Sequence, residues 1–234
     1  MTQTTGEVLR QQREQHGVIV PAGRLPTTNG GSNYSAYAAE HGVGQGGTFI
    51  KFSKDGKFIK TIDDEEIPVG TEMVCVYDQT LAGFIKFTGK GNPPERRMGP
   101  IFDGFMPPKR GDLGNTDESL WERDLSGHPS DPWQHQMMLP LQNAETGELF
   151  IFGTSSITGR RAVNNLLTYC DRMRVKEPDV YPVVKLQVSG FQHRDDRIGW
   201  VKTPAFAVVG RAPKGNISAA TTAIAEDLSD AITF

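Results

Sequence analysis

The feature that most constrains the fold is a series of short strand-like segments, interrupted by a single helix-like segment late in the chain. Residues 160–174 have the helical spacing i, i+3, i+4, i+7, which places Val163, Leu166, Leu167 and Cys170 on one face. The strand-like segments are Thr48–Ser53, Phe58–Ile62, Glu72–Tyr77, Ala82–Phe87, Gln136–Leu141, Leu149–Thr154, Val183–Val188 and Trp200–Val209. This order predicts a mainly β domain with one or two helices, the second being a short helix near the N-terminus, around residues 7–15.

Several strands, one late helix and two closing strands are the element order of the OB (oligonucleotide/oligosaccharide-binding) fold, a small barrel. A β-sandwich, or an α+β sheet with one covering helix, fits the same order. We therefore expect an OB-like domain over residues 47–211, between a flexible arm (1–46) and a flexible acidic tail (212–234). Residues 89–132 are rich in proline and glycine, which predicts a long loop insertion.

The composition is that of one cytoplasmic domain. The chain has 234 residues, of which 37% are hydrophobic and 23% charged, enough for one substantial core. No apolar run reaches the roughly 18 residues of a membrane span, and the polar N-terminus has no secretory signal pattern. Cys75 and Cys170 lie in apolar segments, so we expect them to be buried thiols in a reducing compartment.

The distribution of charge is more informative than the net charge of −3. Three acids and no base lie after residue 225, so the rest of the chain holds 25 basic residues against 28 − 3 = 25 acidic ones. The bases cluster within residues 47–61 and 82–111. Basic patches steer anionic ligands even when the sum of charges is small, so a nucleic-acid partner remains compatible with this chain.

Four strands repeat an aromatic residue followed two positions later by lysine. The pairs are Phe49 with Lys51, Phe58 with Lys60, Phe84 with Lys86, and Trp200 with Lys202. Residues two apart in a strand share a face. Rings beside ammonium groups suit unpaired bases, which stack while their phosphates are neutralised. The alternative is that the rings face the core and the lysines lie at strand ends.

Further basic residues extend this predicted binding surface. Arg160 and Arg161 begin the helix, where free N–H groups favour a phosphate. The other candidates are Arg96 and Arg97 in the long loop, and His193, Arg194 and Arg197 in the last hairpin. In OB folds, the corresponding hairpin loop commonly contacts the bound strand.

The last nine residues, Glu226–Phe234, combine acidic side chains with an apolar end. Ordering a bulky aromatic at a chain end is costly in entropy, whereas a partner with a hydrophobic pocket and a basic rim would bind it. We expect Asp227, Asp230, Ile232 and Phe234 to bind such a partner. The alternative is a plain solvated tail.

This terminus resembles that of bacterial and phage single-stranded DNA-binding proteins, whose acidic tails end in an apolar pair with phenylalanine last. The resemblance implies a protein that coats single-stranded DNA in replication or recombination and recruits enzymes of those processes through its tip. Residues 48–211 are also similar to uncharacterised phage-encoded proteins in the order of the blocks FIKF, WERD, DPWQ and YPVV. That similarity indicates a mobile-element origin and implies no activity.

Signals for an enzyme fail on inspection. The segment Gly153–Arg160 departs from a phosphate-binding P-loop in its glycine spacing, and it has arginine where that motif requires lysine. His128 and His135 have no third ligand at the usual spacing for zinc. We therefore expect no catalytic residue, metal or cofactor. The alternatives are a phage structural or regulatory module that binds protein, and a nuclease whose acids meet only in the fold. A homo-oligomer is compatible with all of these.

Overall fold

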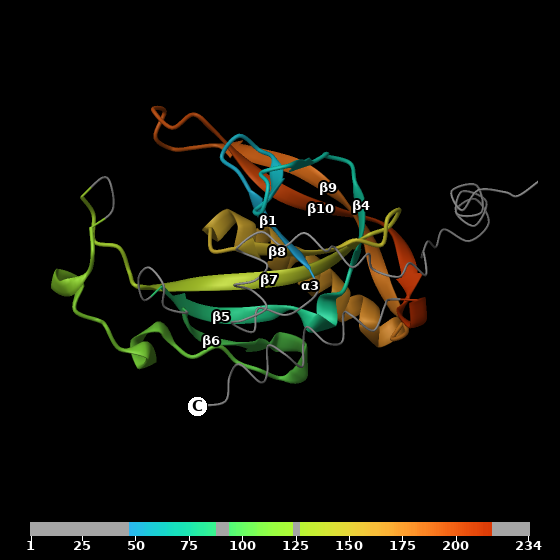
Figure 1. The fold of residues 1–234 in the computed structure, drawn as a ribbon, viewed down its shortest axis with the longest axis horizontal. Helices are drawn as coiled ribbons and strands as arrows, with labels where there is room; N and C mark the ends of the chain where they lie inside the picture. Colours follow the sequence, from blue (N-terminus) through green and yellow to red (C-terminus); the bar gives the residue numbers. More distant parts are fainter. Residues whose placement is uncertain (1–46, 88–93, 124–126, 217–234) are drawn as a thin grey trace, which may run out of the picture.

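The computed structural model describes residues 47–87, 94–123 and 127–216. Within them the protein is mainly β with one α-helix (Figure 1). The expected N-terminal helix and the partner-binding residues Asp227, Asp230, Ile232 and Phe234 lie outside the described residues.

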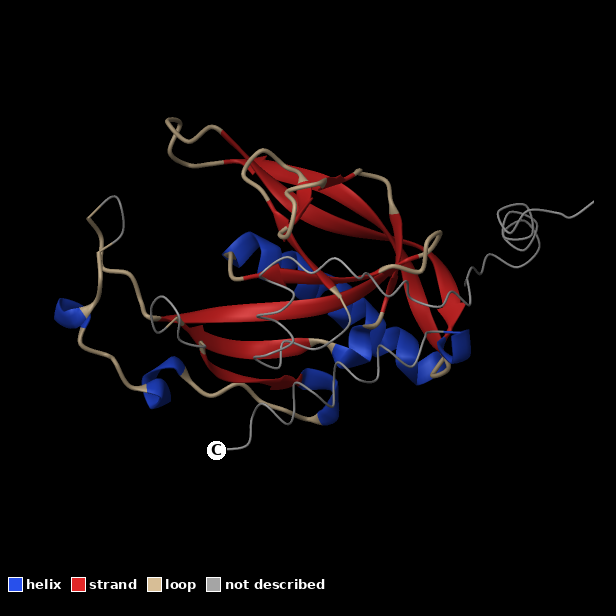
Figure 2. Ribbon diagram, in the orientation of Figure 1, coloured by secondary structure: helices blue, strands red, loops and turns tan. Residues whose placement is uncertain are grey.

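One mixed sheet of ten strands curls into a half-barrel (Figure 2). Its main path runs β10-β9-β4-β7-β8-β1-β2-β3, and β5 and β6 join beside β7. β1 pairs with β8 in parallel, and the other pairings between named strands are antiparallel. The strands are β1 (Thr48–Phe52), β2 (Phe58–Lys60), β3 (Glu66–Ile67), β4 (Glu72–Cys75), β5 (Leu81–Lys86), β6 (Glu95–Pro100), β7 (Trp133–Asn143), β8 (Leu149–Thr154), β9 (Val180–Gln192) and β10 (Trp200–Pro213).

The helix α3 (Ile157–Lys176) lies against the inner side of this curl. Ser156 caps it by accepting a hydrogen bond from the backbone N–H of Gly159 at 3.0 Å. The helical spacing seen in the sequence places the buried side chains correctly, since Val163, Leu166, Leu167, Cys170 and Met173 all enter the core. The predicted helix is confirmed and is longer than residues 160–174 at both ends.

Aromatic rings close the curl where its two edges approach each other. Phe58 of β2 lies near one end of the sheet path and Phe206 of β10 near the other, yet their ring centroids are 6.3 Å apart. Phe152 contacts both, at 6.0 Å and 5.4 Å. The Lys202 ammonium also donates to the carbonyl oxygen of Asp55 at 2.8 Å, which ties β10 to the β1–β2 turn.

The predicted loop over residues 89–132 contains a strand, so that prediction is wrong in part. β6 pairs along the whole of β5, from Leu81 opposite Pro100 to Lys86 opposite Glu95. Gly83 makes the close approach possible, because a Cβ there would collide with the backbone of Arg97 and Met98. Short 3-10 turns follow: η2 (Ile101–Asp103), η3 (Arg110–Leu113) and η4 (Glu118–Leu120).

Cys75 and Cys170 are buried free thiols, as the sequence predicts. Among the described residues, no helix is long and apolar enough to cross a membrane.

Candidate nucleic-acid interface

The directions of the strands bring most of the predicted basic residues to one end of the molecule. β5 ends there, β6, α3 and β10 begin there, and the β9–β10 hairpin projects from it (Figure 1, left). We call this region the basic end. It comprises Lys86, Arg96, Arg97, Arg160, Arg161, Arg194, Arg197 and Lys202.

Five of these cations have no carboxylate partner within the described residues. The Lys86 ammonium donates to Asn115 Oδ1 at 3.0 Å, and Lys202 donates to a backbone carbonyl, so neither charge is neutralised. Arg160, Arg161 and Arg194 make no ion pair in the same set of residues. The basic end therefore keeps positive charge that is available to an anionic ligand.

Two other arginines of the basic end are neutralised locally. Arg97 pairs with Glu95 at 2.9 Å, and Arg197 pairs with Asp195 at 2.7 Å. Exposed pairs of this kind are weak, and a phosphate group competes with the carboxylate for the same guanidinium. Of the two arginines at the hairpin tip, Arg194 is thus the one that has no ion pair within the part of the chain that the structure describes.

The β9–β10 hairpin presents two exposed aromatic rings, Phe191 at 42% and Trp200 at 62% exposure. The indole of Trp200 lies against Gly190, where any side chain would meet its ring nitrogen. At the tip, His193 Nδ1 accepts from the backbone N–H of Asp195 at 3.0 Å and so rigidifies the turn. Phe191 pairs with Val201 and Trp200 pairs with Gln192, so the two rings lie on opposite faces of this ribbon, which also carries Arg194 at its tip.

Phe84 lies on the inner face of β5, with its ring edge-on to His135 at 5.0 Å between centroids. Burial, and then the nearby Arg160 guanidinium, lower the pKa of His135, so this imidazole is neutral at physiological pH. His135 Nδ1 and Arg160 Nε are both buried without a hydrogen-bond partner among the described residues. Together they are enclosed polar atoms without a partner among the described residues, next to a half-buried ring.

The aromatic–lysine pairs do not form one surface, which corrects that expectation. Phe58 is fully buried, so its ring presents no face for stacking. Phe49 lies on the opposite face of the sheet, because its neighbour Ile50 points into the core, and it packs against Ile151 in a second apolar cluster. Neither Phe49 nor Phe58 belongs to the candidate interface.

Three of the four lysines in the first basic cluster of the sequence, residues 47–61, are paired with acids by the fold. The β2–β3 turn carries an acidic run, residues 63–66, which returns alongside β1 and β2. The resulting ion pairs are Lys51–Asp64 at 3.1 Å, Lys57–Glu66 at 2.6 Å and Lys60–Glu65 at 2.7 Å. Lys51 and Lys60 are therefore structural surface residues rather than members of the basic end.

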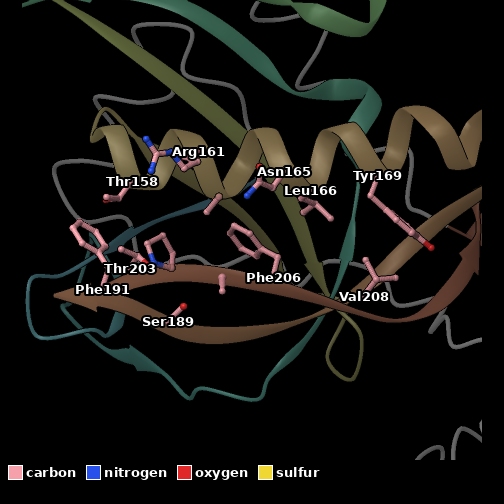
Figure 3. A pocket seen from close by; sticks show the side chains of 13 residues that line it. Thr158, Arg161, Asn165, Leu166, Tyr169, Ser189, Phe191, Thr203, Phe206 and Val208 are labelled. Atoms are coloured by element: carbon pink, nitrogen blue, oxygen red, sulfur yellow. The ribbon is translucent and has the colours of Figure 1, made fainter. Parts of the chain in front are cut away.

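A groove of ≈ 400 Å³ runs between α3 and the β9–β10 ribbon (Figure 3). Leu166, Phe206 and Val208 make its apolar walls, while Thr158 and Arg161 lie at the end of the groove nearest the start of α3. This groove was not predicted from the sequence. Its only sequence signal is a stripe along the helix, Thr158, Ala162, Asn165 and Tyr169, beside the buried stripe.

No family model matches this chain, and neither a curated protein nor a solved structure was found to match it. Among the described residues, no group of three or more His, Cys, Asp or Glu side chains is arranged to hold a metal ion. What the basic end and the groove do is therefore inferred from their own residues.

Proposed function

We propose that this protein binds single-stranded DNA at its basic end, as a non-enzymatic, cytoplasmic DNA-binding protein of phage or plasmid type. The observation that supports this most strongly is the convergence of un-neutralised cations from three distant parts of the chain. Lys86, the start of α3 and the β9–β10 hairpin all lie at this end of the molecule, and the hairpin carries the exposed rings of Phe191 and Trp200. Cations beside exposed rings are the combination that single-strand binders use.

A single strand fits this surface better than a duplex. Proteins that read duplex DNA commonly insert a helix into the major groove. Here α3 packs its apolar face into the core, and its C-terminal half lies away from the basic end. Rings at the surface of a ribbon instead suit bases that are unpaired and splayed.

The OB-like architecture is part of the same proposal. It is supported by the curled sheet and by the order of the late elements, in which α3 follows β8 and precedes the two closing strands β9 and β10. In this proposal the protein coats exposed strands in replication or recombination. A structural or regulatory interaction module would bind no oligonucleotide, and a nuclease would degrade one when a divalent metal is added.

Replacing Trp200 by alanine is expected to weaken binding of oligo-dT by about 1–3 kcal/mol, the contribution of one stacked base. The side chain is 62% exposed, so the variant should remain folded. Val175→Ala is the matched control, because Val175 is also exposed (81%) but lies near the far end of α3. Fluorescence anisotropy of a labelled oligonucleotide measures both. Equal affinities for the two variants would remove Trp200 from the interface.

The C-terminal tip is expected to recruit partners and to be dispensable for DNA binding. Phe234→Ala keeps every charge, so it should abolish capture of replication and recombination proteins from host lysate and leave oligo-dT affinity unchanged. Thr233→Ala is the neighbouring control. Deletion of Glu226–Phe234 should leave affinity for DNA unchanged or raise it, most visibly at low salt, because acids compete with phosphates. Identical captured proteins for both point variants would make the tip an ordinary tail.

A further inference from the structure

We propose that the groove between α3 and the β9–β10 ribbon takes one unstacked nucleobase of the bound strand, with Arg161 holding the adjoining phosphate. This inference rests on the proposed single-strand binding and adds a place where a base is held. Arg161 belongs both to the groove and to the basic end, so a DNA strand bound across the basic end passes the opening of the groove.

The size and walls of the groove suit a base. Small-molecule sites are clefts of about 300–1,000 Å³ with mostly apolar and aromatic walls and a few polar groups. The groove, at ≈ 400 Å³, has Leu166, Pro204, Phe206 and Val208 on its walls. It has room for one flat heterocycle with its sugar, whereas a base that remains paired in a duplex cannot enter.

The walls are held in place before any ligand arrives. Phe206 packs against Phe152 at 5.4 Å and against Phe58 at 6.3 Å, so its ring is fixed from the core side. At the groove end near the basic end, Phe191 is exposed. A fixed ring reduces the entropy lost on binding, which favours stacking of a base in the groove.

Polar groups with unused hydrogen-bonding capacity line the same space. The side chains of Asn165, Ser189 and Thr203 make no hydrogen bond to any described residue. An asparagine amide offers a carbonyl acceptor and an NH₂ donor side by side, which matches the alternating donors and acceptors on the edge of a base. Figure 3 shows Asn165 on the side of α3 that faces Phe206.

Charge selects an anionic ligand. Of the 13 lining residues, Arg161 is the one with a charged side chain, and no carboxylate is among them. A guanidinium at the mouth of an apolar groove fits a base with its phosphate. An acidic peptide, including the chain's own residues 226–234, has related chemistry and is an outcome that the test separates.

Asn165 and Asn164 give a matched pair for this test. They are adjacent and both exposed on α3, but Asn165 lines the groove and Asn164 does not. We expect Asn165→Leu, which fills the groove without changing charge, to lower affinity for oligo-dT by about tenfold, within the contribution of one stacked base. Asn164→Leu should bind as the wild type does. Both variants should bind an abasic strand of equal length with unchanged affinity.

Thermal unfolding of both variants serves as the folding control. Equal affinities of the two variants for oligo-dT would overturn the groove assignment while leaving single-strand binding intact. A parallel loss for the abasic strand would also overturn it, because the lost contact would then not be to a base. A rise in affinity for Asn165→Leu would mean that the acidic C-terminal segment occupies the groove. If the wild type binds no strand at all, the proposed function fails together with this inference.

Discussion

Phe58→Ala is expected to destabilise the fold by about 3–5 kcal/mol, as is usual when a buried phenylalanine is truncated. Phe58 is fully buried and lies 5.1 Å from Phe52, 6.0 Å from Phe152 and 6.3 Å from Phe206, measured between ring centroids. The last contact joins β2 to β10 across the curl of the sheet. The loss is large beside a total stability of about 5–15 kcal/mol for a typical domain, so the variant should lose much of its folded population.

Urea unfolding followed by circular dichroism measures this difference in the free energy of unfolding. Phe87→Ala is the control, because Phe87 is 64% exposed and exposed substitutions usually change stability by no more than about 0.5 kcal/mol. An unfolding midpoint for Phe58→Ala equal to that of the wild type would mean that β2 does not close against β10 in solution.

Phe58 and Phe84 also show what the sequence pattern can and cannot predict. Each is followed two residues later by lysine, yet Phe58 is a core residue and Phe84 is half-buried near the basic end. Alternation predicts which residues share a face of a strand. It does not predict whether that face is buried, because the side chains that pack against it come from segments far away in the sequence. For Phe58 these side chains include Phe206, which the curl of the sheet brings close.

Elements with strong local signals could be predicted from the sequence. β1 and β2 flank Asp55-Gly56, and Gly56 has the positive φ of +81° that this turn requires. β8 likewise follows a continuous apolar run, and the core face of α3 follows the helical spacing. β6 could not be predicted, because Glu95–Pro100 has no apolar alternation and pairs only where Gly83 allows close approach.

The sequence allowed several basic residues of the candidate site to be predicted, but not which of them lie together on one surface. Arg160, Arg161 and Arg194 lie at the basic end, where turn and helix-start signals in the sequence suggested a role. Lys51 and Lys60 do not contribute, because the acids of the β2–β3 turn pair with them. Charge counted along a segment misses such pairs between strands. The groove was missed for a similar reason, since its two walls come from separate elements.

The measurement that most directly tests the central proposal is a salt series of binding to oligo-dT and to a duplex of equal length. Neutralised phosphates release counterions, and the slope of log affinity against log salt is about −0.7 per contact for single strands. Five cations of the basic end have no carboxylate partner among the described residues. They predict a slope of about −3.5, which is a fall of about a hundredfold between about 50 and 200 mM salt.

Arg161→Glu combined with Arg194→Glu should make that slope shallower by at least about 1.4, the share of two contacts. At each salt concentration the wild type should bind oligo-dT more tightly than the duplex, because the rings of Phe191 and Trp200 stack on unpaired bases. Equal affinity for the two ligands, or an affinity for oligo-dT that does not change with salt, would contradict single-strand binding at the basic end.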